Sequence, residues 1–212
     1  MVENQNMMVR RLFVCVVPPK PVLDAAMLVR APLADARGFR PVPRENMHIT
    51  LHFLGDVAVQ SIGSVAAELG NISREIDFER AGGPGLSLAP VGCFPDCRRP
   101  KAVWIGITDD TGSLTRLAQS VAAAVRATGQ RSNGPRFRPH LTLARVRRSA
   151  TQHEVSEAIL SCRDADLFRR RAFQRDSPDT PFTITEMILM ESRLGPNGPT
   201  YIPLQRFPLG AD

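Results

Sequence analysis

The alternation of apolar and polar positions along the chain predicts short strands interleaved with helices. Patterns typical of β-strands cover residues 10–17, 46–54, 76–81, 86–94, 102–107, 140–146, 182–190 and 201–209. The three- and four-residue spacing of an amphipathic helix covers residues 21–29, 59–69 and 111–128. Proline at position 32 and glycine at position 70 are expected to limit the first two helices, and the turn at 195–199 predicts a final hairpin. Short strands with segregated helices indicate an α+β fold.

Two of the predicted strands carry the same phrase, His-aliphatic-Thr-Leu. The two stretches read Asn-Met-His-Ile-Thr-Leu-His-Phe-Leu-Gly (46–55) and Phe-Arg-Pro-His-Leu-Thr-Leu-Ala-Arg (137–145). Side chains alternate between the two faces of a strand, so His48 and Thr50 share one face, and His140 and Thr142 share the corresponding one. The apolar residues between and beyond them face the other way, toward a core: Ile49, Leu51 and Phe53 in the first phrase, and Leu141 and Leu143 in the second. Each phrase therefore predicts an imidazole and a hydroxyl on rigid support.

Two imidazoles that face one cleft suit general acid–base catalysis, because an unperturbed imidazole pKa lies near 6.5. Each such proton transfer is worth about 10²- to 10⁴-fold in rate. The threonine hydroxyls can donate to phosphoryl oxygens without adding charge. Cleavage of a phosphodiester needs a base for the nucleophile, an acid for the leaving oxygen and donors for the phosphoryl oxygens. A lone strand histidine is more often a surface or hydrogen-bonded residue, but the matched pair favours catalysis.

Other polar and aromatic residues fit the two phrases less simply. Alternation places His52 on the face of His48, where we expect a rim position, and it places Arg145 on the face opposite to His140. Arg145 then reaches the cleft only if a β-bulge or the end of the strand turns it. His153 is expected at the surface. Trp104 and Tyr201 are able to stack on a base, although the aliphatic neighbours of Trp104 favour a core role.

Composition favours a phosphate-bearing partner without requiring one. The chain has 212 residues, enough for one large domain or two intimate lobes, with 43% hydrophobic residues. Its net charge is +6 and its pI is near 9.9, and arginine carries the excess. Guanidinium groups fit phosphate oxygens, but the same charge also fits an ordinary solvated surface. The arginine-rich residues 163–175 are interpreted as a solvated helix face in preference to a mobile basic excursion.

The N-terminus and the cysteines exclude several other classes. The first apolar run is too short for a membrane span and no cleavage site follows it, so we expect a cytoplasmic protein with no membrane partner. Cys93 and Cys97 have a loop-like spacing, yet zinc needs about four ligands and no nearby Cys or His completes a set. No metal is therefore expected, and no disulfide either in a reducing compartment. Cys15, in mid-strand, is expected to be a small buried residue.

The two phrases and their flanks resemble the motifs of the two-histidine phosphoesterase superfamily, in particular of the RNA 2',3'-cyclic phosphodiesterases, historically called 2'-5' RNA ligases. Weaker likenesses are Arg-Leu-Phe-Val (11–14), Val-Trp-Ile-Gly (103–106) and Tyr-Ile-Pro-Leu (201–204). The resemblance implies one two-lobed domain over residues 1–212, with two antiparallel sheets and helices outside. Both histidines would face a central, positively charged cleft.

The resemblance also implies an activity: metal-independent hydrolysis of a terminal 2',3'-cyclic phosphate on RNA to a 2'-phosphate, by a monomer without a cofactor. His48 would give a proton to the departing 3'-oxygen, and His140 would activate water. Thr50 and Thr142 would hold the phosphate oxygens, with help from Arg145. The alternatives are 2'-5' ligation of tRNA halves, hydrolysis of a small cyclic nucleotide, and a non-catalytic RNA-binding module, against which the intact double motif argues.

Overall fold

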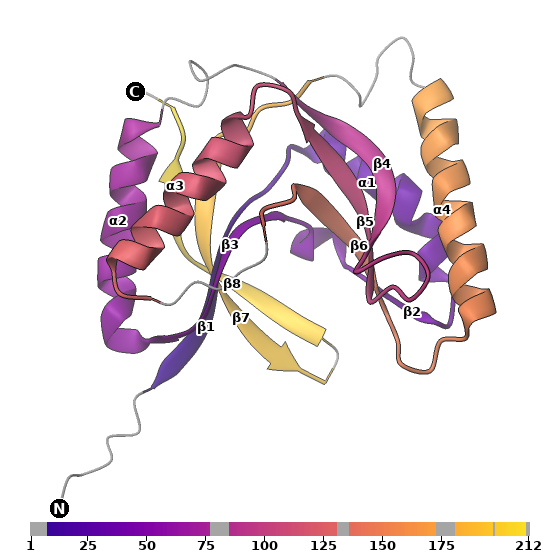
Figure 1. Ribbon diagram of the computed structural model, residues 1–212, viewed down its shortest axis with the longest axis horizontal. Helices are drawn as coiled ribbons and strands as arrows, with labels where there is room; N and C mark the ends of the chain where they lie inside the picture. The colour runs from indigo at the N-terminus through magenta and orange to yellow at the C-terminus, as the bar shows by residue number, and fades with distance from the viewer. Residues whose placement is uncertain (1–7, 77–84, 131–135, 173–180, 197, 211–212) are drawn as a thin grey trace, which may run out of the picture.

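Two four-stranded antiparallel sheets make up the strands of this protein (Figure 1). The structure is a computed structural model that describes residues 8–76, 85–130, 136–172, 181–196 and 198–210. The first sheet has the order β3-β1-β7-β8 and consists of β1 (Val9–Val16), β3 (Ile49–Ala58), β7 (Glu186–Gly195) and β8 (Gly198–Pro208). The second has the order β2-β6-β5-β4 and consists of β2 (Phe39–Pro41), β4 (Leu86–Phe94), β5 (Ala102–Asp109) and β6 (His140–Val146).

The helices cover the outer faces of the sheets. Two of them pack on the sheet that does not contain the strand before them in the chain. They are α1 (Lys20–Ala34), α2 (Ile62–Glu75), α3 (Ser113–Ala127) and α4 (Gln152–Ala172), with the short 3-10 helices η1 (Arg44–Asn46) and η2 (Val59–Ser61). In the described part of the chain, α2 and α3 lie over the first sheet, and α1 and α4 lie over the second (Figure 1). Helix α1 follows a strand of the first sheet but covers the second, and α3 does the reverse. The expectation of one two-lobed domain stays a prediction.

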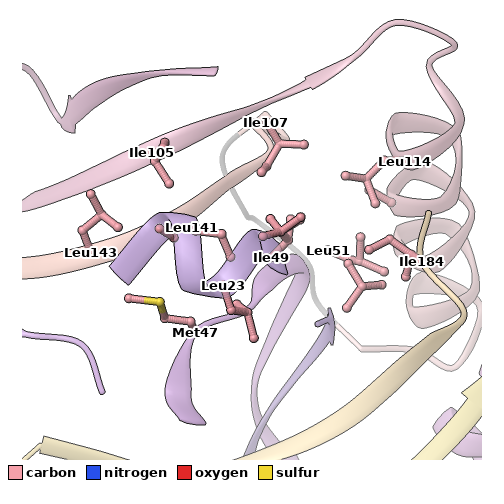
Figure 2. Packing of buried hydrophobic residues seen from close by; sticks show 14 of the residues in the cluster. Leu23, Met47, Ile49, Leu51, Ile105, Ile107, Leu114, Leu141, Leu143 and Ile184 are labelled. Carbon is pink, nitrogen blue, oxygen red and sulfur yellow. The ribbon is translucent and has the colours of Figure 1, made fainter. Parts of the chain in front are cut away.

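The apolar rows of the two histidine strands meet in one core. Ile49 and Leu51 of β3 and Leu141 and Leu143 of β6 are all buried, and Figure 2 shows them packed together with Ile105 of β5. Burial of an aliphatic side chain of this size is worth about 1.5–3 kcal/mol. The prediction that an apolar row supports each histidine–threonine pair is therefore confirmed for these four residues, and the core fixes both strands relative to one another. Phe53, expected in the same row, is exposed, so that part of the prediction is wrong.

The predicted α+β class is confirmed, while several element boundaries differ from the sequence-based ones. Pro32 lies inside α1 near its end, where the missing N–H costs one helical hydrogen bond and buried Leu33 still anchors the last turn. Gly70 does not end α2, because the buried Ile72 continues the apolar face beyond it. Helix α4 confirms a helix over the arginine-rich stretch as far as Ala172, and residues 173–175 lie outside the described part.

Two predicted strands begin differently in the structure. Residues 77–81 of the strand expected at 76–81 lie outside the described residues, and Ile76 caps α2 by donating its N–H to the Ile72 carbonyl. The strand expected from residue 182 begins at Glu186, and Phe182 instead forms an isolated bridge with Leu86. In the described part of the chain, no helix is long and apolar enough to cross a membrane.

Candidate active site

The same backbone contact anchors both histidines. His48 Nδ1 lies 2.8 Å from the carbonyl oxygen of Asn46, and His140 Nδ1 lies 2.7 Å from that of Arg138. A carbonyl oxygen only accepts, so each Nδ1 carries a proton and donates it. The neutral ring therefore keeps Nε2 as an acceptor. His48 Nε2 lies 3.1 Å from Thr50 Oγ1, whose hydroxyl donates to it.

Aromatic side chains wall in each imidazole. Phe13 has its ring centroid 4.9 Å from that of His48, and Tyr201 meets the same imidazole edge-on at 5.1 Å. On the other side of the site, Phe94 meets His140 edge-on at 4.9 Å. These rings remove water from both imidazoles, which penalises their charged forms.

Burial lowers the pKa of both histidines. It lowers the pKa of His48 to about 4, helped by the positive charges of His140 and Arg145 and opposed by the hydrogen bond to the Asn46 carbonyl. The pKa of His140 is lowered first by burial and then by the charges of Arg138 and Arg145, while the hydrogen bond to the Arg138 carbonyl opposes the shift. In the protein alone, both rings are therefore mainly neutral at pH 7.

A β-bulge interrupts β3 directly after its threonine. Thr50 pairs with Cys15 and His52 pairs with Val14, so Leu51 has no partner on β1. One extra residue reverses the facing of the side chains that follow it, here as far as a second bulge at Leu54, which also has no partner on β1. His52 consequently turns to the face of the core residue Val14, and the next residue along β3 turns to the face of Thr50.

Strand β6 has a bulge at the corresponding position. Thr142 pairs with Trp104 and Ala144 pairs with Val103, so Leu143 has no partner on β5. The bulge turns Arg145 onto the face of Thr142, where it borders the cleft. The condition that the sequence sets for Arg145 is thus met, and its role in binding stays a prediction.

The two bulges give the cleft two different residues at equivalent positions. Three residues beyond its threonine, β3 presents Phe53, which is 58% exposed, and β6 presents Arg145. The expectation that His52 lies at the rim on the face of His48 is wrong. His52 is buried although it borders the cleft, and its pKa is lowered by burial and by the charge of Arg126 on α3.

A cleft of about 1040 Å³ brings the two phrases together. It is bordered by both histidines and both threonines named by the sequence. Its cationic side chains are Arg40, Lys101, Arg136, Arg138 and Arg145. None of the described residues that border it is acidic, so the cleft favours an anion. Sequence reasoning missed the first four of these cations, which lie in short loops and strand ends without a recognisable motif.

The remaining aromatic and histidine predictions have different outcomes. Tyr201 borders the cleft beside His48. Trp104 is half-buried and, among the described residues, belongs to neither cluster of buried hydrophobic side chains, so a core role is wrong. Its ring centroid lies 5.9 Å from that of His140. His153 lies at the surface 3.4 Å from Glu157, as expected.

Cysteine pairing is a further correction. Cys93 and Cys97 form a disulfide with a Cα–Cα distance of 5.1 Å, so the expectation that they stay reduced is wrong. The tight loop between them brings the two Cβ atoms together, and an expectation based on compartment does not include this geometry. Cys15 is buried, and burial raises the pKa of its thiol to about 12, in agreement with a small core residue. In the described part of the chain, no group of three or more His, Cys, Asp or Glu residues is placed to hold a metal ion.

Fold and site together define a member of a known superfamily. The family model of the 2'-5' RNA ligase superfamily matches residues 19–196, and this chain belongs to that superfamily. It is 32% identical over 197 residues to the RNA 2',3'-cyclic phosphodiesterase of Archaeoglobus fulgidus, with 93% of this chain and 99% of the relative covered. It is 30% identical over 171 residues to that of Aquifex aeolicus, with 80% and 81% covered.

Solved structures show the same fold. The crystal structure of TT0787 of Thermus thermophilus superposes with a TM-score of 0.69 at 24% identity and covers 95% of this chain and 99% of its own. Escherichia coli LigT in complex with 3'-AMP superposes with a TM-score of 0.64 at 23% identity and covers 96% and 100%. The two-sheet α+β architecture expected from the resemblance is therefore confirmed.

Proposed function

We propose that this chain hydrolyses the terminal 2',3'-cyclic phosphate of RNA to a 2'-phosphate and a free 3'-hydroxyl. The observation that carries the proposal is the geometry of the cleft. Two histidine–threonine pairs, each anchored through Nδ1, border one cleft that has five cations and no acidic residue among its described borders. The relatives from Archaeoglobus and Aquifex, both RNA 2',3'-cyclic phosphodiesterases, support RNA as the substrate.

In the proposed reaction, the two imidazoles move one proton each. His140 Nε2 takes a proton from water, and the water oxygen attacks phosphorus. The bond from phosphorus to the 3'-oxygen breaks, and His48 Nε2–H gives its proton to that oxygen. Thr50 and Thr142 donate to the phosphoryl oxygens, and the Arg145 guanidinium compensates their negative charge. Side chains supply base, acid and donors, so no step in this scheme uses a metal or a cofactor.

The lowered pKa of His48 makes the acid role depend on the substrate. At a pKa of about 4, His48 is almost fully neutral at pH 7. A phosphodiester beside the ring adds a negative charge, which favours the protonated imidazole. Binding of the substrate therefore creates the acid that the cleavage needs, and the same anion offsets the repulsion from His140 and Arg145.

Product analysis on an RNA that ends in a 2',3'-cyclic phosphate tests the proposal. We expect a 2'-phosphate product, and His48→Gln and His140→Gln should each lower kcat by about 10²- to 10⁴-fold while the circular-dichroism spectrum stays unchanged. His153→Gln is the matched control, because this histidine lies at the surface outside the cleft, and its kcat should equal that of the wild type. A 3'-phosphate product would reverse the leaving group.

Other outcomes of the same assay separate the alternatives. Equal kcat/KM for the RNA and for a mononucleotide 2',3'-cyclic phosphate would indicate a small-nucleotide enzyme. A joined product with a 5'-hydroxyl RNA would indicate 2'-5' ligation. Salt-dependent binding without turnover would indicate a binding module. The monomeric state stays a prediction, which light scattering of the purified protein would check.

A further inference from the structure

The Cys93–Cys97 disulfide encloses a residue that touches a catalytic imidazole. Phe94 and Pro95 lie between the two cysteines, and both border the cleft. Cys93 is buried and pairs with Val103 on β5, so one end of this small ring is fixed in the core. The disulfide links the other end, Cys97, back to that fixed point.

Phe94 is the centre of an aromatic and cationic stack around His140. Its ring meets His140 edge-on at an interplanar angle of 80°, and it lies 5.1 Å from the ring of Trp104. The guanidinium carbon of Arg138 lies 5.8 Å from the centroid of Phe94 and 5.7 Å from that of Trp104. Arg138 also provides the carbonyl oxygen that accepts from His140 Nδ1. The orientation of His140 therefore depends on a stack that includes Phe94.

The two histidines differ in how their walls are supported. The walls of His48 are Phe13 on β1, an inner strand of its sheet, and Tyr201 on β8, an edge strand whose residues pair with β7 on both sides of Tyr201. Phe94 is the last residue of β4, an edge strand of the second sheet in the described part of the chain. Phe94 pairs with Ala102 of β5, and its carbonyl accepts the N–H of Lys101, but beyond Phe94 the chain leaves the strand. The disulfide adds a covalent link where the strand pairing of β4 ends.

We propose that Phe94 is a positioning residue for His140 and that the Cys93–Cys97 disulfide holds it in place, so that reduction of this disulfide lowers turnover. A dithiol reductant supplies two electrons and two protons. The sulfur–sulfur bond breaks, Cys93 and Cys97 become thiols, and the dithiol becomes its own cyclic disulfide. Cys97 is half-buried whereas Cys93 is buried, so Cys97 is the more accessible end of the bond.

Kinetics with matched cysteine variants test the role of the disulfide, and this part rests on the proposed function. Reduced wild type and the double variant Cys93→Ser/Cys97→Ser should lose roughly ten- to hundred-fold in kcat with KM changed by less than about twofold, because a misplaced base affects the chemical step. Cys162→Ser is the control: this free cysteine is buried outside the cleft, and the variant should match wild type before and after reduction. Thiol titration first confirms that reduction has produced two new thiols. If kcat is then unchanged, the proposal is wrong.

NMR of the imidazole Cε1–H signals tests the positioning of His140 without any substrate. Water reaches His140 when Phe94→Leu removes the aromatic wall, so the pKa of His140 should rise toward its ordinary value, while Phe94→Tyr, which keeps the ring, should leave it low. Two charged groups act on His140, namely Arg138 and Arg145, and they are the same in all variants. The signal of His52 is the internal reference, because burial and Arg126 lower its pKa and His140 does not contribute.

Reduced wild type should show the same selective change, which removes any dependence on how well Phe94→Leu folds. A role in stability alone would move the signals of His140 and His52 together, or would move neither. The proposal is wrong if the pKa of His140 is equal in oxidised and reduced wild type. If wild type did not hydrolyse the RNA at all, the proposed function would fail, and these titrations would still decide the role of Phe94.

Discussion

Binding of an anion should raise the pKa of His48, which is about 4 in the protein alone. Sulfate is a suitable probe, because it keeps its charge over the whole pH range of the experiment. A unit negative charge about 4 Å from the ring contributes roughly 4 kcal/mol at an effective dielectric constant of about 20, which corresponds to roughly 3 pKa units. This offsets the combined effect of burial and of the charges on His140 and Arg145.

The magnitude changes what the ring can do at neutral pH. Protonated His48 should increase from about one molecule in a thousand at pH 7 to several tenths of the molecules once the anion is bound. By linkage, the anion should also bind at least tenfold more tightly at pH 5 than at pH 8. The sign follows from the direction of the shift: the complex takes up a proton that the free protein lacks.

A pH titration of the imidazole Cε1–H signals, with and without saturating sulfate, measures the shift directly. His48→Gln assigns the signal by its disappearance. Chloride at equal ionic strength controls for screening, and the exposed His153 provides a signal that should not move with sulfate. A His48 pKa near 6.5 without sulfate, or a pKa that stays near 4 with it, would refute the link between substrate charge and the acid.

Three further predictions concern other parts of the site. The free energy of unfolding should fall by up to about 3 kcal/mol as the pH decreases from about 6.5 to about 4, because unfolded His48 takes up a proton that the folded ring resists. Urea titrations should show a smaller decrease for His48→Gln. An equal decrease with pH in wild type and variant would contradict the buried neutral ring. Arg145→Met should raise KM by roughly tenfold through the loss of a charge-assisted hydrogen bond, and an unchanged KM would remove Arg145 from the phosphate site. Cys93→Ser/Cys97→Ser should lower the free energy of unfolding by about 2 kcal/mol, the value for a loop of this length, and calorimetry against Cys162→Ser checks it.

Local sequence patterns were sufficient for the parts of the fold that depend on local physics. The apolar rows around His48 and His140 identify two strands, their buried face and the polar pair on the other face, and all of these are present. The same patterns do not show which sheet a helix covers. Helix α1 packs on the second sheet, against α4, because tertiary packing decides the partner of an apolar face.

The parts that failed depend on a neighbouring strand. Strict alternation puts His52 on the face of His48, which is wrong, and lets Arg145 reach the cleft only through a bulge, which β6 has. The positions of the two bulges are set by pairing with β1 and with β5. A bulge leaves no clear signal in one strand alone, since Leu51 and Leu143 are ordinary β-strand residues. The disulfide likewise depends on where the chain turns after β4.

The two bulges also explain how a nearly symmetric cleft can act on an asymmetric substrate. Both histidines have the same anchor on a backbone carbonyl, so this hydrogen bond cannot distinguish an acid from a base. The positions beyond the bulges do differ, with an exposed aromatic ring at Phe53 and a cation at Arg145. A ligand with one anionic and one apolar end binds such a cleft in one orientation, because the reverse orientation removes the cation from the phosphate. The bulge directly after each threonine thereby gives two similar histidine–threonine pairs different neighbours.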